Sequence, residues 1–193
     1  ALAGEAADVL YHLLVMLEAC DLSLDDALAA LAAREGVSGV DEKAARDMPV
    51  VIERALCPEH LARCFALRVE VFIAEEGVSA ADEQDGEDGA CRHWIAHRGT
   101  ETLGTLRVKP TGPQGGQGAK IQRVAISRRA RGKGLGARLM RSVLSELGVE
   151  DQPIWLESQT SAIPFYERLS FFAEGPEFMD AGIPHRRMVH HGR

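Results

Sequence analysis

The stretch at residues 121–140, IQRVAISRRARGKGLGARLM, constrains the fold of this chain more than any other. Apolar residues among polar neighbours at 121–126 predict a half-buried strand, and the spacing of Leu135 and Leu139 predicts a helix. Between them lies a glycine-rich turn, and residues 120–141 carry eight basic side chains and no acidic one. Such a turn leaves backbone N–H groups free at the positive end of a helix dipole. The stretch therefore predicts a strand, an anion-binding turn and a helix.

Three protein families use this device, and the residues of the turn separate them. A P-loop ATPase requires Lys-Ser or Lys-Thr after the glycines, and this pair is absent. A dinucleotide-binding fold requires G-x-G-x-x-G, whereas Gly132, Gly134 and Gly136 are evenly spaced. The pattern Arg-x-x-Gly-x-Gly, directly after a strand ending in Arg-Val-Ala-Ile, resembles the acyl-CoA loop of the GNAT superfamily of N-acyltransferases. The alternative is a basic surface turn without a ligand.

The same resemblance continues along the chain, from about residue 48 to residue 189. Residues 154–159 and 162–171 resemble the fifth strand and the fourth helix of the superfamily. Residues 182–188, like the motifs at Leu67-Arg68-x-x-Val71-Phe72 and Glu83-x-Asp85-x-x-Asp88, resemble its ElaA-like branch. Two positions depart from the pattern: Ser170 replaces the usual glycine, and Glu76 stands where the branch usually has glutamine.

The resemblance implies an α/β fold, with a mixed, mostly antiparallel sheet flanked by helices and with the fourth and fifth strands splayed apart. It also implies an acetyl-CoA-dependent N-acetyltransferase, which transfers an acetyl group directly to a primary amine. Tyr166 would be the general acid for the departing thiolate; its alternative is a buried aromatic residue of the core. The residues expected to bind the cofactor are Val124, Ala125, Ile126, Arg131, Gly132, Lys133, Gly134, Leu135, Gly136, Ala137 and Gln159.

The acceptor amine cannot be identified from the sequence, whether polyamine, antibiotic or protein N-terminus. An amine with a pKa near 10.4 is protonated at pH 7, so a base or an ordered water must accept a proton. The base stays open among Glu157, His93 and the acids of residues 82–88. The acidic run at residues 82–88 could attract a cationic amine or be a solvated loop. His93 and His185 could each be a residue of the core or of the rim instead. The candidates for acceptor binding are Glu83, Asp85, Asp88, His93, Glu157 and His185.

Composition limits the other classes of function. Residues 1–47 carry ten acidic and three basic side chains, while residues 48–193 are neutral overall, which argues against a nucleic-acid partner. The four cysteines form no C-x-x-C pair, and we predict no metal site and a reducing, cytoplasmic location. No apolar run approaches the length of a membrane span, and a secretion signal is not expected.

Residues 1–36 predict a two-helix appendage, followed by a polar linker at 37–47 and the acetyltransferase domain at 48–193. Leucines at helical spacing predict a helix at 5–20, and Ser23 predicts the N-cap of a second helix that Gly36 ends. The segment resembles the C-terminal part of phosphoribosyl-ATP pyrophosphohydrolase, in which carboxylates bind magnesium, but Glu5-x-x-Asp8 supplies only one pair. A structural role as a homodimer interface is our preferred hypothesis.

The remaining elements follow from local signals. We predict an edge strand at 48–56, a helix from Pro58 to Gly77, a hairpin at 92–97 and 102–108, and a flexible connection at 111–118. Three other functions stay open: a nucleotide pyrophosphohydrolase, a CoA sensor without catalysis, and an interaction module.

Overall fold

The structure is a computed structural model that describes residues 2–19, 23–26, 28, 48–114, 116–148 and 152–191. The chain forms two compact units, Ala1–Asp47 and Met48–Arg193. None of the helices in the described part combines the length and the apolar character that a membrane crossing requires.

The first unit contains α1, which spans Leu2–Ala19 and so begins before the predicted residue 5. Ser23 acts as the predicted cap: its hydroxyl accepts a hydrogen bond from the Asp26 N–H at 3.1 Å, and its own N–H donates to Asp26 Oδ2 at 2.8 Å. This reciprocal pair is a capping box. The remainder of the predicted second helix, its stop at Gly36 and the linker at 37–47 lie outside the described residues.

The second unit is built on a sheet of seven strands, in the order β1-β2-β3-β4-β5-β7-β6. Neighbouring strands are antiparallel except β4 and β5, which are parallel. The mixed, mostly antiparallel sheet predicted from the sequence is therefore confirmed. The strands are β1 (Val51–Arg54), β2 (Arg92–Arg98), β3 (Glu101–Lys109), β4 (Ala119–Ile126), β5 (Ile154–Gln159), β6 (Phe171–Asp180) and β7 (Ile183–His190).

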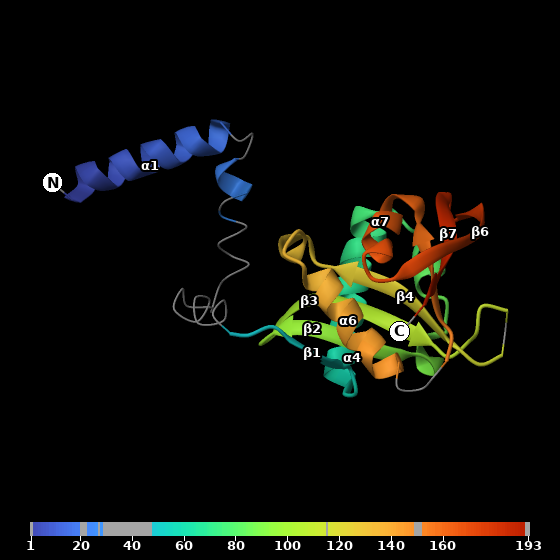
Figure 1. Cartoon of the computed structure of the whole chain (residues 1–193). Helices are drawn as coiled ribbons and strands as arrows, with labels where there is room; N and C mark the ends of the chain where they lie inside the picture. Colours follow the sequence, from blue (N-terminus) through green and yellow to red (C-terminus); the bar gives the residue numbers. More distant parts are fainter. Residues whose placement is uncertain are drawn as a thin grey trace. The chain divides into compact units, whose positions relative to one another are not determined.

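Two helices, α4 (Pro58–Arg68) and α6 (Leu135–Leu147), cover opposite faces of this sheet. Trp94 of β2 packs in the main core with the buried leucines of α6, while its neighbour Ile95 packs in a separate cluster with Cys64 of α4. Successive side chains of a strand point to opposite faces, which explains this division. Figure 1 shows α6 lying across one face of the sheet.

The single helix predicted from Pro58 to Gly77 is wrong in its second half. Pro58 opens α4 as expected, but the chain continues as a π-helical turn, η1 (Val69–Glu75), and turns away at Gly77, where φ is +72°. A π-helical turn inserts extra residues and changes which side chains share a face. It places Phe72 and Glu76 on the wall of a cavity described below.

Other differences are smaller. β1 is shorter than predicted, and the predicted fourth helix shrinks to α7 (Ile163–Glu167), which follows a 3₁₀ turn, η5 (Thr160–Ala162). Further short turns are α5 (Ala80–Glu83), η2 (Asp88–Ala90) and η3 (Arg128–Ala130).

Ser170, in the turn between α7 and β6, has a left-handed conformation with φ of 63°. A side chain is strained at this φ, whereas glycine is not, so we expect Ser170→Gly to stabilise the protein by about 1 kcal/mol. The midpoint of thermal unfolding should rise by about 2–4 °C. Ser145→Gly, on the exposed face of α6, is the control and should lower the midpoint, because glycine disfavours a helix interior. A fall in both variants would contradict the strain at Ser170.

Candidate active site

The sheet opens between β4 and β5. These two parallel strands pair only from Ala119↔Ile154 to Ile121↔Leu156, although β4 continues to Ile126 and β5 to Gln159. The register with β3 shifts in the same region, and Arg123 has a φ of 53°. An irregularity of this kind is a β-bulge, which bends a strand and increases its twist. The open end of the β4–β5 pair, here called the wedge, leaves one edge of β4 unpaired.

The turn between β4 and α6 has the backbone geometry that an anion site requires. Gly132 and Gly134 have φ of 73° and 75°, and a Cβ built on either would meet no atom within 4 Å. The first helical hydrogen bond runs from the Arg138 N–H to the Gly134 carbonyl at 3.1 Å, and no side chain caps the helix. The N–H groups of residues 135–137 therefore have no partner within α6, and these residues line a cavity described below.

The basic side chains of this turn contact the protein itself. Arg131 donates to the Ile126 carbonyl at 2.9 Å and pairs with Glu75 at 2.6 Å. Lys133 donates to the Arg129 carbonyl at 2.9 Å. Their positive charge stays beside the turn, but their hydrogen bonds brace its backbone. Main-chain amides are thus the principal donors available to an anion.

Two cavities meet at the wedge. The first, of about 570 Å³ and here called the turn groove, runs along the glycine turn. The second, of about 240 Å³ and here called the inner cleft, lies between β4, β5 and the residues after α4. Glu76, Val124 and Tyr166 line both. Among the predicted cofactor residues, the turn groove is lined by Val124, Ile126, Arg131, Gly132, Gly134, Leu135, Gly136 and Ala137.

Three predicted cofactor residues, Ala125, Lys133 and Gln159, do not line the turn groove. Lys133 lies in the turn itself, with its side chain on the Arg129 carbonyl. Ala125 is 1% exposed and packs with Leu67 and Val71, on the face of the sheet that α4 covers. Gln159 ends β5 and lines the inner cleft, where its amide donates to Glu76 at 3.1 Å. Side chains alternate between the two faces of a strand, so the side chain of Ala125 points opposite to those of Val124 and Ile126 and does not line the groove with them.

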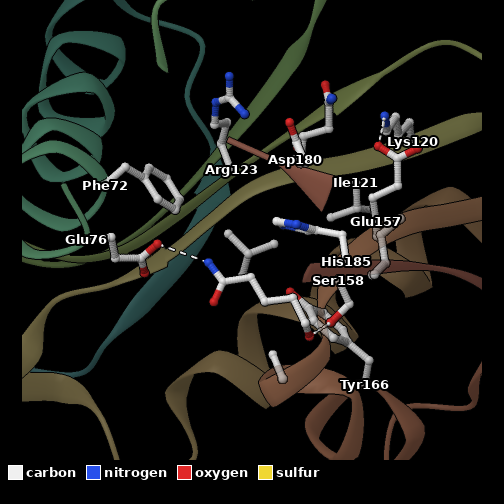
Figure 2. A pocket seen from close by; sticks show the side chains of 15 residues that line it. Phe72, Glu76, Lys120, Ile121, Arg123, Glu157, Ser158, Tyr166, Asp180 and His185 are labelled. Carbon is white, nitrogen blue, oxygen red and sulfur yellow. Dashed lines mark hydrogen bonds and ion pairs between the residues drawn. The ribbon is translucent and has the colours of Figure 1, made fainter. Parts of the chain in front are cut away.

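Tyr166, the predicted general acid, reaches the wedge from α7. Its ring packs edge-on against Phe165 and Phe171, with ring centroids 4.9 Å and 5.9 Å away. Burial raises the pKa of the Tyr166 hydroxyl above its usual value, because the charged phenolate loses solvation. The hydroxyl is therefore protonated at neutral pH. In Figure 2, Tyr166 and Glu76 lie on the wall of one cavity.

Three of the four acids predicted to bind the acceptor, those within residues 82–88, are engaged by arginines of the protein. Glu83 is 2% exposed and pairs with Arg68 at 2.5 Å, while Asp88 accepts from Arg68 at 2.6 Å. Asp85 pairs with Arg107 and, at 3.2 Å, with Arg123. Glu83, Asp85 and Asp88 are therefore paired within the protein and not free to attract an amine, although Asp82 and Asp85 are exposed at the surface. Glu83 and Asp85 still border an outer extension of the inner cleft, and Asp88 does not.

These ion pairs also set the acid response of the stretch. Hydrogen bonds from Arg107 lower the pKa of Asp85. Burial alone would raise the pKa of Asp88, but hydrogen bonds from Arg68 and Arg107 outweigh it and lower that pKa as well. A carboxyl with a depressed folded-state pKa stabilises the fold above its ordinary pKa, and this contribution disappears as the pH falls through the folded value. The paired stretch thus stays intact across the neutral range.

The other acceptor candidates divide between the core and the inner cleft. His93 is buried against Phe65, its Nε2 lies 3.0 Å from the Asp88 carbonyl, and it lines neither the turn groove nor the inner cleft. Glu157 lines the cleft and pairs with Lys120 at 2.5 Å. His185 also lines it, with Nδ1 2.8 Å from the Ile183 carbonyl.

Several residues of the inner cleft were not predicted as site residues, among them Phe72, Glu76, Lys120 and Asp180. Figure 2 shows all four around the cavity. The sequence held a signal for two of them: Phe72 belongs to the Leu67-Arg68-x-x-Val71-Phe72 motif, and Glu76 departs from the usual glutamine. Lys120 is placed by the parallel pairing of β4 with β5, and Asp180 by the turn into β7, so neither carries a local motif.

A sheet split beside an amide-lined turn at a helix N-terminus defines the acyl-CoA N-acyltransferase fold, and the comparisons agree. A family model described as an acetyltransferase (GNAT) domain matches residues 57–191. The chain therefore belongs to the GNAT acetyltransferase family. It is 32% identical to a predicted acetyltransferase of Bacillus subtilis over 144 residues, which cover 72% of this chain and 94% of that protein.

Two solved structures are similar in fold. An acyl-CoA N-acyltransferase from Pseudomonas aeruginosa is 30% identical, with a TM-score of 0.65, and the match covers 75% of this chain and 99% of that one. ElaA of Escherichia coli is 25% identical, with a TM-score of 0.66, covering 74% and 99%. The match to ElaA agrees with the branch that the motifs indicated. The family match begins at residue 57 and does not bear on the pyrophosphohydrolase resemblance of residues 1–36.

Proposed function

We propose that this protein is an acetyl-CoA-dependent N-acetyltransferase that transfers an acetyl group directly to a primary amine. One observation carries the proposal: the turn groove and the inner cleft meet at Tyr166, a protonated hydroxyl. The turn groove suits a nucleotide-bearing donor, and the inner cleft suits an acceptor. The free cysteines Cys57, Cys64 and Cys91 support a reducing, cytoplasmic location.

The residues of the turn groove fit coenzyme A. The N–H groups of residues 132–137 would hold the pyrophosphate, since the space beside Gly132 and Gly134 is open and the helix dipole is positive there. β4 pairs with β3 on one side, and beyond Ile121 its other edge lacks a strand partner. That edge, at Val124 and Ile126, would bind the amides of the pantetheine arm as a strand binds an extended peptide.

Two of the residues that line both cavities, Glu76 and Tyr166, suit the proton transfers of this reaction. When bound, the thioester supplies an acyl carbon that an amine nitrogen can attack. Freeing a lysine-type amine of its proton costs about 4–5 kcal/mol at pH 7. Glu76 would accept this proton, directly or through a water, as the new carbon–nitrogen bond forms. Tyr166 would donate its hydroxyl proton to the sulfur as the carbon–sulfur bond breaks.

Charge and position favour Glu76 over the other carboxylates: Asp180 also lines the inner cleft, but Glu76 lines the turn groove as well. Glu157 is paired with Lys120, and Asp85 is paired with Arg107 and Arg123. Glu76, by contrast, accepts a hydrogen bond from the neutral amide of Gln159. Within the described residues its carboxylate makes no ion pair, so it is available to a cationic acceptor.

We expect Glu76→Gln to lower kcat/KM for a cationic amine about tenfold or more, because about 1.4 kcal/mol of attraction or proton transfer is lost. Affinity for CoA should stay unchanged. Glu70→Gln, on the exposed side of η1, is the matched control and should behave as the wild type. Steady-state kinetics with varied amine and fixed acetyl-CoA measures both. Equal losses in the two variants would remove Glu76 from the mechanism.

The proposed activity is tested with the full chain in two steps. A thermal shift with acetyl-CoA separates a CoA-binding protein from an interaction module, which would show no shift. Release of free thiol across a panel of amines then separates an enzyme from a sensor. Magnesium-dependent release of phosphate from a nucleotide would instead support the pyrophosphohydrolase alternative.

The homodimer through the N-terminal helices stays a prediction. Several apolar side chains of α1 are largely exposed, among them Tyr11 at 65% and Met16 at 65%. We expect sedimentation of the full chain to give a dimer, and a version lacking residues 1–36 to give a monomer. An unchanged mass would contradict the interface.

A further inference from the structure

A second group of chemically reactive side chains lies where β1, α4 and β2 meet. Glu53, His60 and His97 come from these three elements, and we call them the Glu-His-His cluster. One ligand atom from each residue lies within 4.8 Å of those of the other two. Glu53 Oε1 is 3.0 Å from His97 Nε2 and 3.6 Å from His60 Nδ1. None of the three residues lines the turn groove or the inner cleft.

These separations match the shell of a small metal ion. Zinc takes nitrogen and oxygen ligands at about 2.0–2.1 Å in a tetrahedral arrangement, which places neighbouring ligand atoms about 3.3–3.5 Å apart. Both distances given for the cluster fall close to this range. Three converging ligands would leave a fourth position for water.

His97 is already held in the orientation of a metal ligand. Its Nδ1 lies 2.9 Å from the Gly99 carbonyl and its Nε2 lies 3.0 Å from Glu53 Oε1, so the ring is fixed with Nε2 directed at the carboxylate that would share the ion. A backbone carbonyl on the far nitrogen is a frequent second partner of a metal-binding histidine. The same carbonyl accepts from Arg63 at 3.1 Å, which fixes its position.

The cluster is also partly protected from solvent. The side chains of His60 and His97 are 22% and 14% exposed, and their rings lie 5.2 Å apart. Two half-buried imidazoles beside one carboxylate form a donor set that suits borderline divalent transition metals better than calcium or magnesium, which prefer oxygen ligands.

We propose that Glu53, His60 and His97 bind a divalent transition-metal ion, with Zn²⁺ as the best match to the donor set. The ion would join the short edge strand β1 to the helix above it and to β2. β1 has four residues and pairs only with β2, so an added link at Glu53 restrains the edge of the sheet. The site is independent of the acetyl transfer proposed above.

The test uses the full chain without an affinity tag and Zn²⁺ alone as the probe. Calorimetry should give one ion per chain, and Zn²⁺ at a hundredfold excess over its Kd should raise the unfolding midpoint by about 5–10 °C. His60→Ala and His97→Ala should each weaken binding at least about 100-fold, and Glu53→Gln about tenfold or more. His12→Ala and His191→Ala, which remove exposed histidines elsewhere, should leave the affinity unchanged.

A measurement on the wild type covers the case in which a variant does not fold. Zn²⁺ should shift the imidazole NMR signals of His60 and His97 and leave that of His93, which is buried elsewhere, in place. Failure of the wild type to bind Zn²⁺ would overturn the proposal, and so would an equal loss of affinity in the control variants or zinc-induced shifts at other histidines only.

Discussion

Gly134→Asp is expected to lower the affinity for coenzyme A at least about 100-fold, which corresponds to about 2.7 kcal/mol. Gly134 opens α6, and the space beside it is the space that a pyrophosphate would fill. A carboxylate there adds bulk and a negative charge where the main chain offers bare N–H groups to an anion. Calorimetry with CoA measures the loss, and a near-normal Kd would contradict the proposed position of the pyrophosphate.

The variant also needs a control for backbone strain, because Gly134 has a φ of 75°. Gly116, with a φ of 79° and open space around it, lies in the connection between β3 and β4, outside the turn groove and the inner cleft. Gly116→Asp places the same side chain on the same kind of backbone. It should cost about 1 kcal/mol of stability, as Gly134→Asp should, without weakening CoA binding.

Tyr166→Phe is expected to lower kcat about 100- to 1,000-fold and to leave the affinity for CoA unchanged. The substitution removes the hydroxyl proton and keeps the ring that packs between Phe165 and Phe171. General acid catalysis by a positioned group contributes about 10²- to 10⁴-fold, so the loss should appear in kcat rather than in binding. Steady-state kinetics at saturating acetyl-CoA measures it.

A pH profile gives an additional readout. Because the pKa of Tyr166 is raised, loss of its proton should limit the wild-type rate only at alkaline pH, and that alkaline limb should change in the variant. Tyr11→Phe alters the only other tyrosine of the chain and should match the wild type throughout. Wild-type kcat in Tyr166→Phe would mean that another group or a water protonates the thiolate.

The sequence was most informative where structure depends on neighbouring residues. The strand, glycine turn and helix at 121–147 follow from apolar spacing and from the backbone freedom of glycine, and all three are present. Pro58 at the start of α4 and the cap at Ser23 are equally local and equally correct. Such features need no knowledge of the rest of the chain.

The roles of the charged residues depended on contacts that the sequence does not show. Glu83 and Asp85 resembled free carboxylates, but their partners Arg68 and Arg107 are 15 and 22 positions away. Glu157 is neutralised by Lys120, 37 positions away, through the parallel pairing of two strands. Glu76 reaches the inner cleft only because the helix before it widens into a π-helical turn. Charge patterns alone could not distinguish a paired acid from a free one.

The wall that Glu76, Val124 and Tyr166 share has a kinetic consequence. In the proposed reaction both reactants would border the same three residues, so we expect donor and acceptor to occupy the protein together before either is consumed. Double-reciprocal plots at several fixed donor concentrations should intersect, as for a ternary complex, instead of running parallel as they do when a covalent acyl-enzyme forms first.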